Sequence, residues 1–255
     1  MPGTTTALVG ATGGAGVTRT AVELAATLAR DGRDVAILDA AYATQGLSHY
    51  VDGRLDPDLT ALVTDSDEPL DAGLVDLDVS GADGRVTCCP AAAPFERLAR
   101  AKTPESAQRL EDRIAEAATA FDHVLVDTPP VATNQAVAAV TAVDRVVLVT
   151  PGTRRGADAL QRMRARFRDV GVTADATLST RDTIDDADAV VPASDVTTAA
   201  DAPACPNSTG EFAAAVAAAT EVAVDEELSL EFDEEGLFET VESYVAERRG
   251  WPSSP

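Results

Sequence analysis

The chain has 255 residues, of which 45% are hydrophobic, and its 43 acidic against 20 basic residues give a formal net charge of −23. This length supports one substantial core, so a single domain followed by a tail is the expectation. The charge excludes non-specific binding to nucleic-acid backbones and to anionic lipid surfaces, because like charges repel.

The basic side of the composition is unusual, because Lys102 is the only lysine and every other basic residue is arginine. Only 4% of the residues are aromatic, and abundant Asp, Ala, Val and Thr complete a composition that resembles the proteins of extreme halophiles. In molar salt the Debye length falls to about 3 Å, so a dense acidic shell can keep a protein hydrated and soluble. We therefore interpret the acidity as a habitat signature, with an acidic binding face as the alternative.

Cysteine usage and hydropathy point to the cytoplasm. Cys88, Cys89 and Cys205 are odd in number and lack CxxC spacing, which fits neither a disulfide framework nor a zinc site. No apolar run approaches the roughly 20 residues that span a bilayer, and the N-terminus shows no charged signal-peptide head. We expect a cytoplasmic protein that is neither exported nor integral to a membrane.

The chain opens with a βαβ pattern. Residues 6–9 are predicted to form a strand, and a glycine-rich stretch leads from it into an apolar-periodic helix that Asp31-Gly32 ends. A second strand, 35–38, stops at Asp39. This length suits a right-handed parallel crossover.

The βα alternation continues through most of the chain. The expected strands are 86–90, 123–127, 145–149 and 174–178, and the expected helices are a short one near 55–63, then 105–120, 135–140, 157–170 and 210–223. This alternation predicts an α/β fold with a doubly wound, mostly parallel sheet in a single domain. Ligands of such sheets bind beyond the carboxyl ends of the strands, where the glycine-rich stretch, Asp39 and Asp127 all fall.

The glycine-rich turn is the first candidate site. It spans residues 10–20 with the sequence GATGGAGVTRT. Such a turn presents consecutive backbone N–H groups and a helix N-terminus to an anion. The candidate nucleotide-binding residues are Gly13, Gly14, Ala15, Gly16, Val17 and Thr18. Taken alone, the loop leaves open the alternative that it serves only tight packing.

Acidic strand ends favour the nucleotide interpretation. Asp39 ends the second strand, and residues 121–130 read FDHVLVDTPP, with Asp127 at the end of the strand. Over roughly residues 6–222 the chain resembles the MinD/ParA family of deviant P-loop ATPases, whose loop reads KGGxGKT and whose Walker B strand ends DTPP. The proline-stopped strand at Pro90 and the sequence VLVTP at 147–151 belong to the same resemblance.

The resemblance implies a P-loop NTPase-like fold and a Mg-ATP site, but the loop departs from the family motif where the motif carries charge. The signature lysine falls on Thr12 and the Walker A lysine on Val17, so both cations are gone. The family's DxD becomes Asp39-Ala40-Ala41, so an alanine replaces the carboxylate that the resemblance assigns to positioning the attacking water. Thr18, Asp39 and Asp127 survive as candidate Mg²⁺ ligands. The asparagine that often reads adenine is not evident near 178–181.

Other charged residues near these motifs are expected to take no part in phosphate binding. Arg19 lies one residue beyond the lysine position, about 100° around the helix, so we expect it to point away from the phosphates. The alternative is that it replaces the lysine. Arg154 and Arg155 follow a strand end and are interpreted as solvated charges rather than phosphate ligands. His49 and His123 have no partner at ligand spacing.

Residues 225–255 are expected to form an acidic tail beyond the domain of residues 1–224. Its apolar residues share one face of a short candidate amphipathic helix: Leu237, Phe238, Val241, Tyr244 and Val245. In MinD proteins a C-terminal helix docks on membranes, but membrane-surface helices are rich in Lys and Arg, whereas Asp and Glu precede this stripe. We therefore expect it to pack on the protein's own body or on a partner, and membrane anchoring is not expected.

The leading hypothesis is a MinD/ParA-like protein with a degenerate nucleotide site, which acts as a non-hydrolysing spatial or regulatory protein through protein partners. Phosphoryl transfer relies on positioning and on cations, so no catalytic residue is assigned and ATP hydrolysis is expected to be lost or vestigial. Mg-ATP is expected to bind weakly or not at all, and without the signature lysine no nucleotide-dependent dimer is expected. The alternatives are an unorthodox ATP-binding ATPase or switch, and a regulatory module with an empty cradle.

Overall fold

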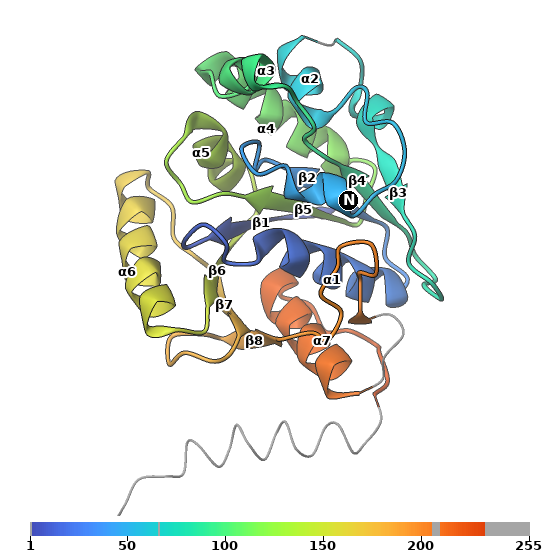
Figure 1. Cartoon of the computed structure of the whole chain (residues 1–255), viewed down its shortest axis with the longest axis vertical. Coiled ribbons are helices and arrows are strands. Elements are labelled where there is room, and N and C mark those ends of the chain that lie inside the picture. Colours follow the sequence, from blue (N-terminus) through green and yellow to red (C-terminus); the bar gives the residue numbers. More distant parts are fainter. Residues whose placement is uncertain (1, 66, 206–209, 233–255) are drawn as a thin grey trace, which may run out of the picture.

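An eight-stranded sheet forms the centre of the molecule, in the order β3-β4-β2-β5-β1-β6-β7-β8 (Figure 1). The computed structural model describes residues 2–65, 67–205 and 210–232. The strands are β1 (Thr4–Gly10), β2 (Val35–Asp39), β3 (Val75–Leu77), β4 (Val86–Cys89), β5 (His123–Thr128), β6 (Arg145–Pro151), β7 (Ala176–Arg181) and β8 (Ala189–Pro192).

All neighbouring strands are parallel except β3, which pairs antiparallel with β4 at one edge of the sheet. The carboxyl ends of the parallel strands therefore meet along one edge. In this register Asp39 at the end of β2 lies beside Asp127 near the end of β5. The expectation of a mostly parallel α/β sheet is confirmed.

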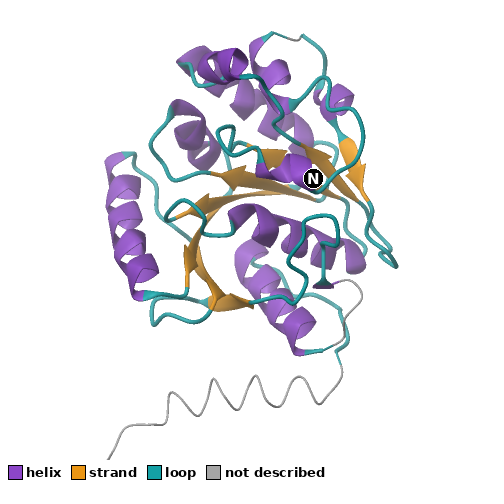
Figure 2. Ribbon diagram, viewed as in Figure 1, coloured by secondary structure: helices purple, strands orange, loops and turns teal. Residues whose placement is uncertain are grey.

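Helices cover both faces of the sheet (Figure 2). The α-helices are α1 (Val17–Arg30), α2 (Leu59–Thr64), α3 (Phe95–Arg100), α4 (Pro104–Ala118), α5 (Asn134–Thr141), α6 (Arg154–Asp169) and α7 (Glu211–Val224), and two 3₁₀ turns are η1 (Gly46–His49) and η2 (Leu70–Gly73). Side chains of α1 and α7 pack in one buried cluster, and those of α2, α4, α5 and α6 pack in the other. The sheet is thus the middle of three layers.

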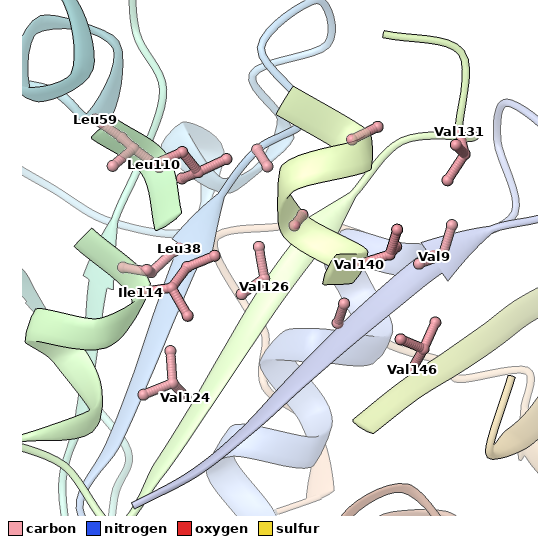
Figure 3. Close-up of a cluster of buried hydrophobic side chains, with 14 of the residues drawn as sticks. Val9, Leu38, Leu59, Leu110, Ile114, Val124, Val126, Val131, Val140 and Val146 are labelled. Carbon is pink, nitrogen blue, oxygen red and sulfur yellow. The ribbon is translucent and has the colours of Figure 1, made fainter. Parts of the chain in front are cut away.

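The central strands are apolar on both sides because each side faces a helical layer. In β1, Val9 belongs to the cluster under α4 and α5, whereas Leu8 belongs to the cluster under α1 and α7. In β5, Val126 belongs to the cluster under α4 and α5, and Leu125 belongs to the cluster under α1 and α7. Figure 3 shows the first of these clusters, with Val9 and Val126 among its labelled residues. Each fully buried side chain of this size stabilises the fold by roughly 1.5–3 kcal/mol, so the core fixes the strand ends that carry the site.

The structure corrects several of the predicted boundaries. The last predicted strand, 174–178, is observed two to three residues later, as β7 (Ala176–Arg181). Asp175 precedes the strand, and its carboxylate accepts the N–H of Val146. Helix α6 begins at residue 154 rather than 157, because the hydroxyl of Thr153 caps it by accepting the N–H of Gly156 at 3.0 Å. Strands β3 and β8 and helix α3 were not predicted, because their apolar runs are too short to show a period.

Residues 225–232 continue beyond α7 and contact the body of the domain. The carboxylate of Asp225 lies 3.2 Å from the guanidinium of Arg145, and the side chains of Leu228 and Phe232 pack against the cluster under α1 and α7. The division of the chain at residue 224 stays a prediction. The expected amphipathic helix over 237–245 lies outside the described residues.

Candidate functional site

The glycine-rich loop joins β1 to α1 at the carboxyl edge of the sheet (Figure 1). Gly14 and Gly16 have φ angles of 73° and 89°, in the left-handed region that residues with a Cβ atom adopt only at a cost. Gly16 is the N-cap residue of α1, and no side chain caps this helix. The N–H groups of its first turn are therefore available to another acceptor, which is the backbone arrangement of a phosphate cradle.

Neighbouring strands hold the loop in this shape. The hydroxyl of Thr180, at the end of β7, donates to the carbonyl oxygen of Ala15 at 2.9 Å. On the same edge, the N–H of Ala11 donates to the carbonyl oxygen of Val149 in β6 at 2.8 Å. Thr180 was not predicted as a site residue, because the strand was expected to end at residue 178. The signal that could have found it is a polar residue at the carboxyl end of a strand.

The six predicted cradle residues form one continuous turn and differ in accessibility. Gly13 and Gly14 are exposed, Ala15 is buried, and Gly16, Val17 and Thr18 are half-buried. A Cβ added to Gly13 would meet no atom within 4 Å. The open side of the loop is therefore at its tip, where a ligand would approach.

The three candidate metal ligands converge below this loop. The hydroxyl of Thr18 donates to Asp127 Oδ2 at 2.5 Å, and Asp127 pairs in register with Asp39. A Cβ added to Gly46, at the start of η1, would lie only 2.9 Å from the Thr18 hydroxyl oxygen. The segment after β2 thus closes over Thr18, a close approach that the sequence analysis did not predict.

Both carboxyl groups are buried, and their pKa values are perturbed accordingly. Burial, together with the charge of Asp127, raises the pKa of Asp39 to about 8, although Asp39 accepts the N–H groups of Ala41 at 2.9 Å and Ala91 at 3.4 Å. Burial raises the pKa of Asp127 to about 6, against the lowering effect of the Thr18 hydrogen bond. Burial removes both carboxyl groups from water, and a negative charge on one disfavours a negative charge on the other. The pair therefore holds a proton near neutral pH unless a cation replaces that proton.

This donor set fits a divalent cation. Mg²⁺ prefers oxygen ligands and is commonly held by one or two carboxylates with waters and substrate phosphates. Asp39, Asp127 and the Thr18 hydroxyl offer such oxygens beside the cradle, and a cation there would relieve the charge that burial makes costly. These three residues could therefore hold Mg²⁺.

The positions of the family's charged residues carry uncharged side chains. Thr12 and Val17 are both half-buried, and the Cγ2 atom of Val17 would lie 3.2 Å from a Cβ added to Gly10, so Val17 packs across the base of the loop. Ala41 is 7% exposed, and its backbone is engaged in the turn after β2, where its carbonyl oxygen accepts the N–H groups of Thr44 and Gln45. None of these three side chains can contribute a charge to the site.

The guanidinium of Arg19 faces away from the cradle, as helix geometry predicts. It contacts Glu23 at 2.7 Å and donates to the carbonyl oxygen of Val196 at 3.1 Å. Glu23 is fully buried and also accepts the N–H groups of Ala204 and Cys205. Arg19 therefore balances a buried carboxylate that anchors the segment before α7, and this contact argues against the alternative that it replaces the missing lysine.

The remaining predicted residues lie outside the cradle. His49 is an exposed residue of η1, and Arg154 and Arg155 are exposed at the start of α6. His123 is buried at the start of β5, at the opposite edge of the sheet, where burial lowers its pKa and its Nε2 atom lies 3.7 Å from the carboxylate of Glu226. This partner could not be predicted from local sequence patterns, because Glu226 follows α7, far from His123 along the chain.

A parallel sheet whose central strand leads through a glycine-rich loop into a helix, with carboxylates on the neighbouring strands, defines the class of P-loop proteins. Residues 3–179 match the family model described as AAA domain, so the chain belongs to the AAA domain family. A comparison with curated proteins finds no match in sequence. Among the helices of the described ranges, none combines the length and the apolar character that a bilayer crossing requires.

Solved structures share the fold of the whole domain. The cell division ATPase MinD of Pyrococcus furiosus is similar with a TM-score of 0.68 and 20% identity, covering 86% of this chain and 98% of that chain. The septum site-determining protein MinD of Pyrococcus horikoshii, solved with Mg-ADP, gives 0.68 and 20%, covering 86% and 94%. A ParA family ATPase of Chlorobium tepidum gives 0.59 and 18%, covering 94% and 89%. The fold is that of the MinD and ParA ATPases.

Proposed function

We propose that this chain is a MinD/ParA-like protein that does not hydrolyse ATP at a useful rate and acts, through protein partners, as a spatial or regulatory protein. The observation that carries the proposal is the absence of charge at Thr12, Val17 and Ala41, where the family motif has two lysines and a carboxylate. The engagement of Arg19 with Glu23 supports it, because the neighbouring cation is already committed.

The proposal follows from what phosphoryl transfer needs. Its transition state spreads negative charge over the phosphoryl oxygens, and enzymes stabilise that charge with lysine, arginine and metal ions. The ionisable groups at the base of this cradle include the carboxyl groups of Asp39 and Asp127, which are neutral or negative and so cannot supply positive charge. Without cations from the protein, the barrier stays close to that of the unaided metal–nucleotide complex.

Weak or absent binding of Mg-ATP is part of the proposal. Backbone N–H groups of the turn from Gly13 to Thr18 would contact the phosphates, and Thr18, Asp39 and Asp127 would hold the metal. A bound Mg²⁺ supplies positive charge that offsets the phosphates. Loss of both lysines removes the charge-assisted contacts that are the strong part of phosphate binding, so the affinity should be low.

The second candidate function is a working but unorthodox ATPase or nucleotide-dependent switch. The hydrogen bond from Thr18 to Asp127, at 2.5 Å, favours it, because both residues are candidate Mg²⁺ ligands. A titration of the protein with fluorescent ATP and Mg²⁺ in molar KCl separates the two candidates. Tight binding that Asp127→Ala abolishes would support the switch, whereas weak or absent binding supports the non-hydrolysing protein.

The proposal also covers location and assembly. We infer a cytoplasmic protein without direct nucleic-acid contacts, membrane anchor or nucleotide-driven dimer. Supporting observations are the net charge of −23 and the burial of Cys88, Cys89 and Cys205 as free thiols. Buried free thiols are compatible with a reducing compartment, and the charge opposes contact with phosphate-rich surfaces.

A further inference from the structure

Helix α6 carries a charge opposite to that of the whole chain. Its residues 154–169 include six arginines and two aspartates, a net charge of +4 within a protein of −23. Arg154 and Arg155 are its first two residues, at the positive end of the helix dipole, where cations are unfavourable. No acidic residue in the first turn offsets their charge. Their placement does not serve the helix, which points to a role in binding.

Some of these arginines are engaged by the body of the domain. Arg164 binds Asp186 at 3.1 Å, and Arg166 donates to the carbonyl oxygen of Val131 at 3.3 Å. The side chains of the others form no hydrogen bond or ion pair with any described residue, and all of them are exposed: Arg154, Arg155, Arg162 and Arg168. We call these four the α6 arginine face.

Helical spacing gathers the α6 arginine face on the solvent side of the helix. The opposite side of α6 is buried in the core through Ala159, Leu160, Met163 and Phe167. In Figure 1 the helix stands at one side of the molecule, with no further element on its outer side. The face is thus an exposed cluster of arginine side chains without a partner among the described residues, interrupted by the exposed carboxylates of Asp158 and Asp169.

An acidic polypeptide fits this surface better than a nucleic acid does. Asp158 is exposed on the same helix, and Asp186 already occupies Arg164 beside it. A continuous phosphate backbone would meet these carboxylates and the net negative charge of the rest of the protein. A peptide can place separate carboxylates opposite separate arginines, each of which offers a planar, bidentate fork.

We propose that the α6 arginine face binds the C-terminal segment of the same chain, residues 233–255. This segment contains six acidic residues, Asp233, Glu234, Glu235, Glu239, Glu242 and Glu247, against two arginines. Because the segment is tethered to the domain, its effective concentration at α6 is in the millimolar range. A separate acidic partner of equal affinity would need a higher concentration than this to displace it. The inference goes beyond the proposed function, since it does not depend on the state of the nucleotide site.

The tether is long enough for this contact. Phe232 packs beside α1, with its ring centre 5.9 Å from the guanidinium carbon of Arg30. The residues beyond it could span up to roughly 80 Å when extended, whereas a domain of this size is about 45 Å across. Even with residues 237–245 in a helix, which rises by only about 1.5 Å per residue, the segment can reach α6.

A fluorescence experiment on the full chain tests the proposal. Trp251 is the only tryptophan and lies in the segment, and the native cysteines are buried, so an added surface cysteine can be labelled selectively. Gln161→Cys on α6 carries a bimane label, which tryptophan quenches on contact. Gln108→Cys on α4 is the matched control, because both glutamines are exposed and each donates to a nearby carboxylate at 2.7 Å.

We expect the label at position 161 to be quenched in the full chain but not in a chain that ends at residue 232. The fluorescence of the label at position 108 should be the same in both chains. Replacing Arg155, Arg162 and Arg168 together by Gln should raise the fluorescence to that of the truncated chain, whereas Arg54→Gln should not. Circular dichroism checks that the triple variant is folded. Equal fluorescence of the label at position 161 in the full and truncated chains would overturn the proposal, as would quenching that survives the triple substitution. Quenching that grows with protein concentration would also overturn it, because the quenching segment would then come from a second copy of the chain.

Discussion

Replacing Asp39 by Asn tests whether a proton neutralises the buried carboxyl pair. Burial and the charge of Asp127 raise the pKa of Asp39 from 3.8 to about 8, so this side chain is neutral in the folded protein at neutral pH. Asn is neutral at every pH and keeps an oxygen for the N–H of Ala41, which Asp39 accepts at 2.9 Å. The variant therefore removes the titration and preserves the main hydrogen bond.

The sign of the effect follows from linkage between proton binding and folding. The pKa of Asp39 is higher in the folded state than in the unfolded state, so its stabilising contribution is complete below about pH 4 and is lost as the pH rises through about 8. A difference of about four units corresponds to at most about 6 kcal/mol. Because Asp127 shares the proton, we expect a loss on the order of 2–4 kcal/mol between about pH 5 and about pH 8.

Urea unfolding, followed by circular dichroism at fixed salt with EDTA present, measures this loss. The wild-type protein should lose stability relative to Asp39→Asn as the pH rises, so the variant becomes the more stable protein at about pH 8. Asp78→Asn, at an exposed position, is the control and should follow the wild-type curve. Parallel pH curves for the wild type and Asp39→Asn would refute the reasoning.

The remaining predictions concern the nucleotide site, the tail and assembly. ATP turnover should stay near background, since two cations and one carboxylate are missing; phosphate release at an ordinary kinase rate that Asp127→Ala abolishes would contradict this. The full chain should not float with anionic liposomes, because acidic residues precede the apolar stripe of the tail; flotation that requires Phe238 would show a lipid anchor. Light scattering in molar KCl should give the same mass with and without Mg-ATP, and a mass that doubles only with nucleotide would restore the conventional switch.

The sheet and the position of the site could be predicted because both depend on local patterns. Strands β5 and β6 are long apolar runs with polar ends, so their period and their limits are visible in the sequence. Asp39 and Asp127 could be placed together because parallel strands end at one edge. The direction of Arg19 followed from the angle between consecutive helix residues, and its contact with Glu23 confirms it.

The contacts that the sequence did not reveal join segments distant in the chain. The bond from Thr180 to Ala15 and the approach of Gly46 to Thr18 depend on how loops close over the edge of the sheet, which no local period records. The short strands β3 and β8 exist only because a neighbouring strand offers hydrogen bonds to them. Tertiary context decides such elements, and single-sequence patterns do not contain it.

The glycines of the cradle that adopt the left-handed backbone conformation bear on how such loops are recognised in genomes. The positive φ angles of Gly14 and Gly16 let the chain turn from β1 into α1, and a hydrogen bond from Thr180 to Ala15 fastens that turn to the sheet through groups of the protein itself. A glycine-rich signature would therefore persist in a lineage that had given up nucleotide chemistry, because folding alone selects for it. Annotation of ATPases from glycine spacing should accordingly be weighted by the basic residues between the glycines, which folding does not require.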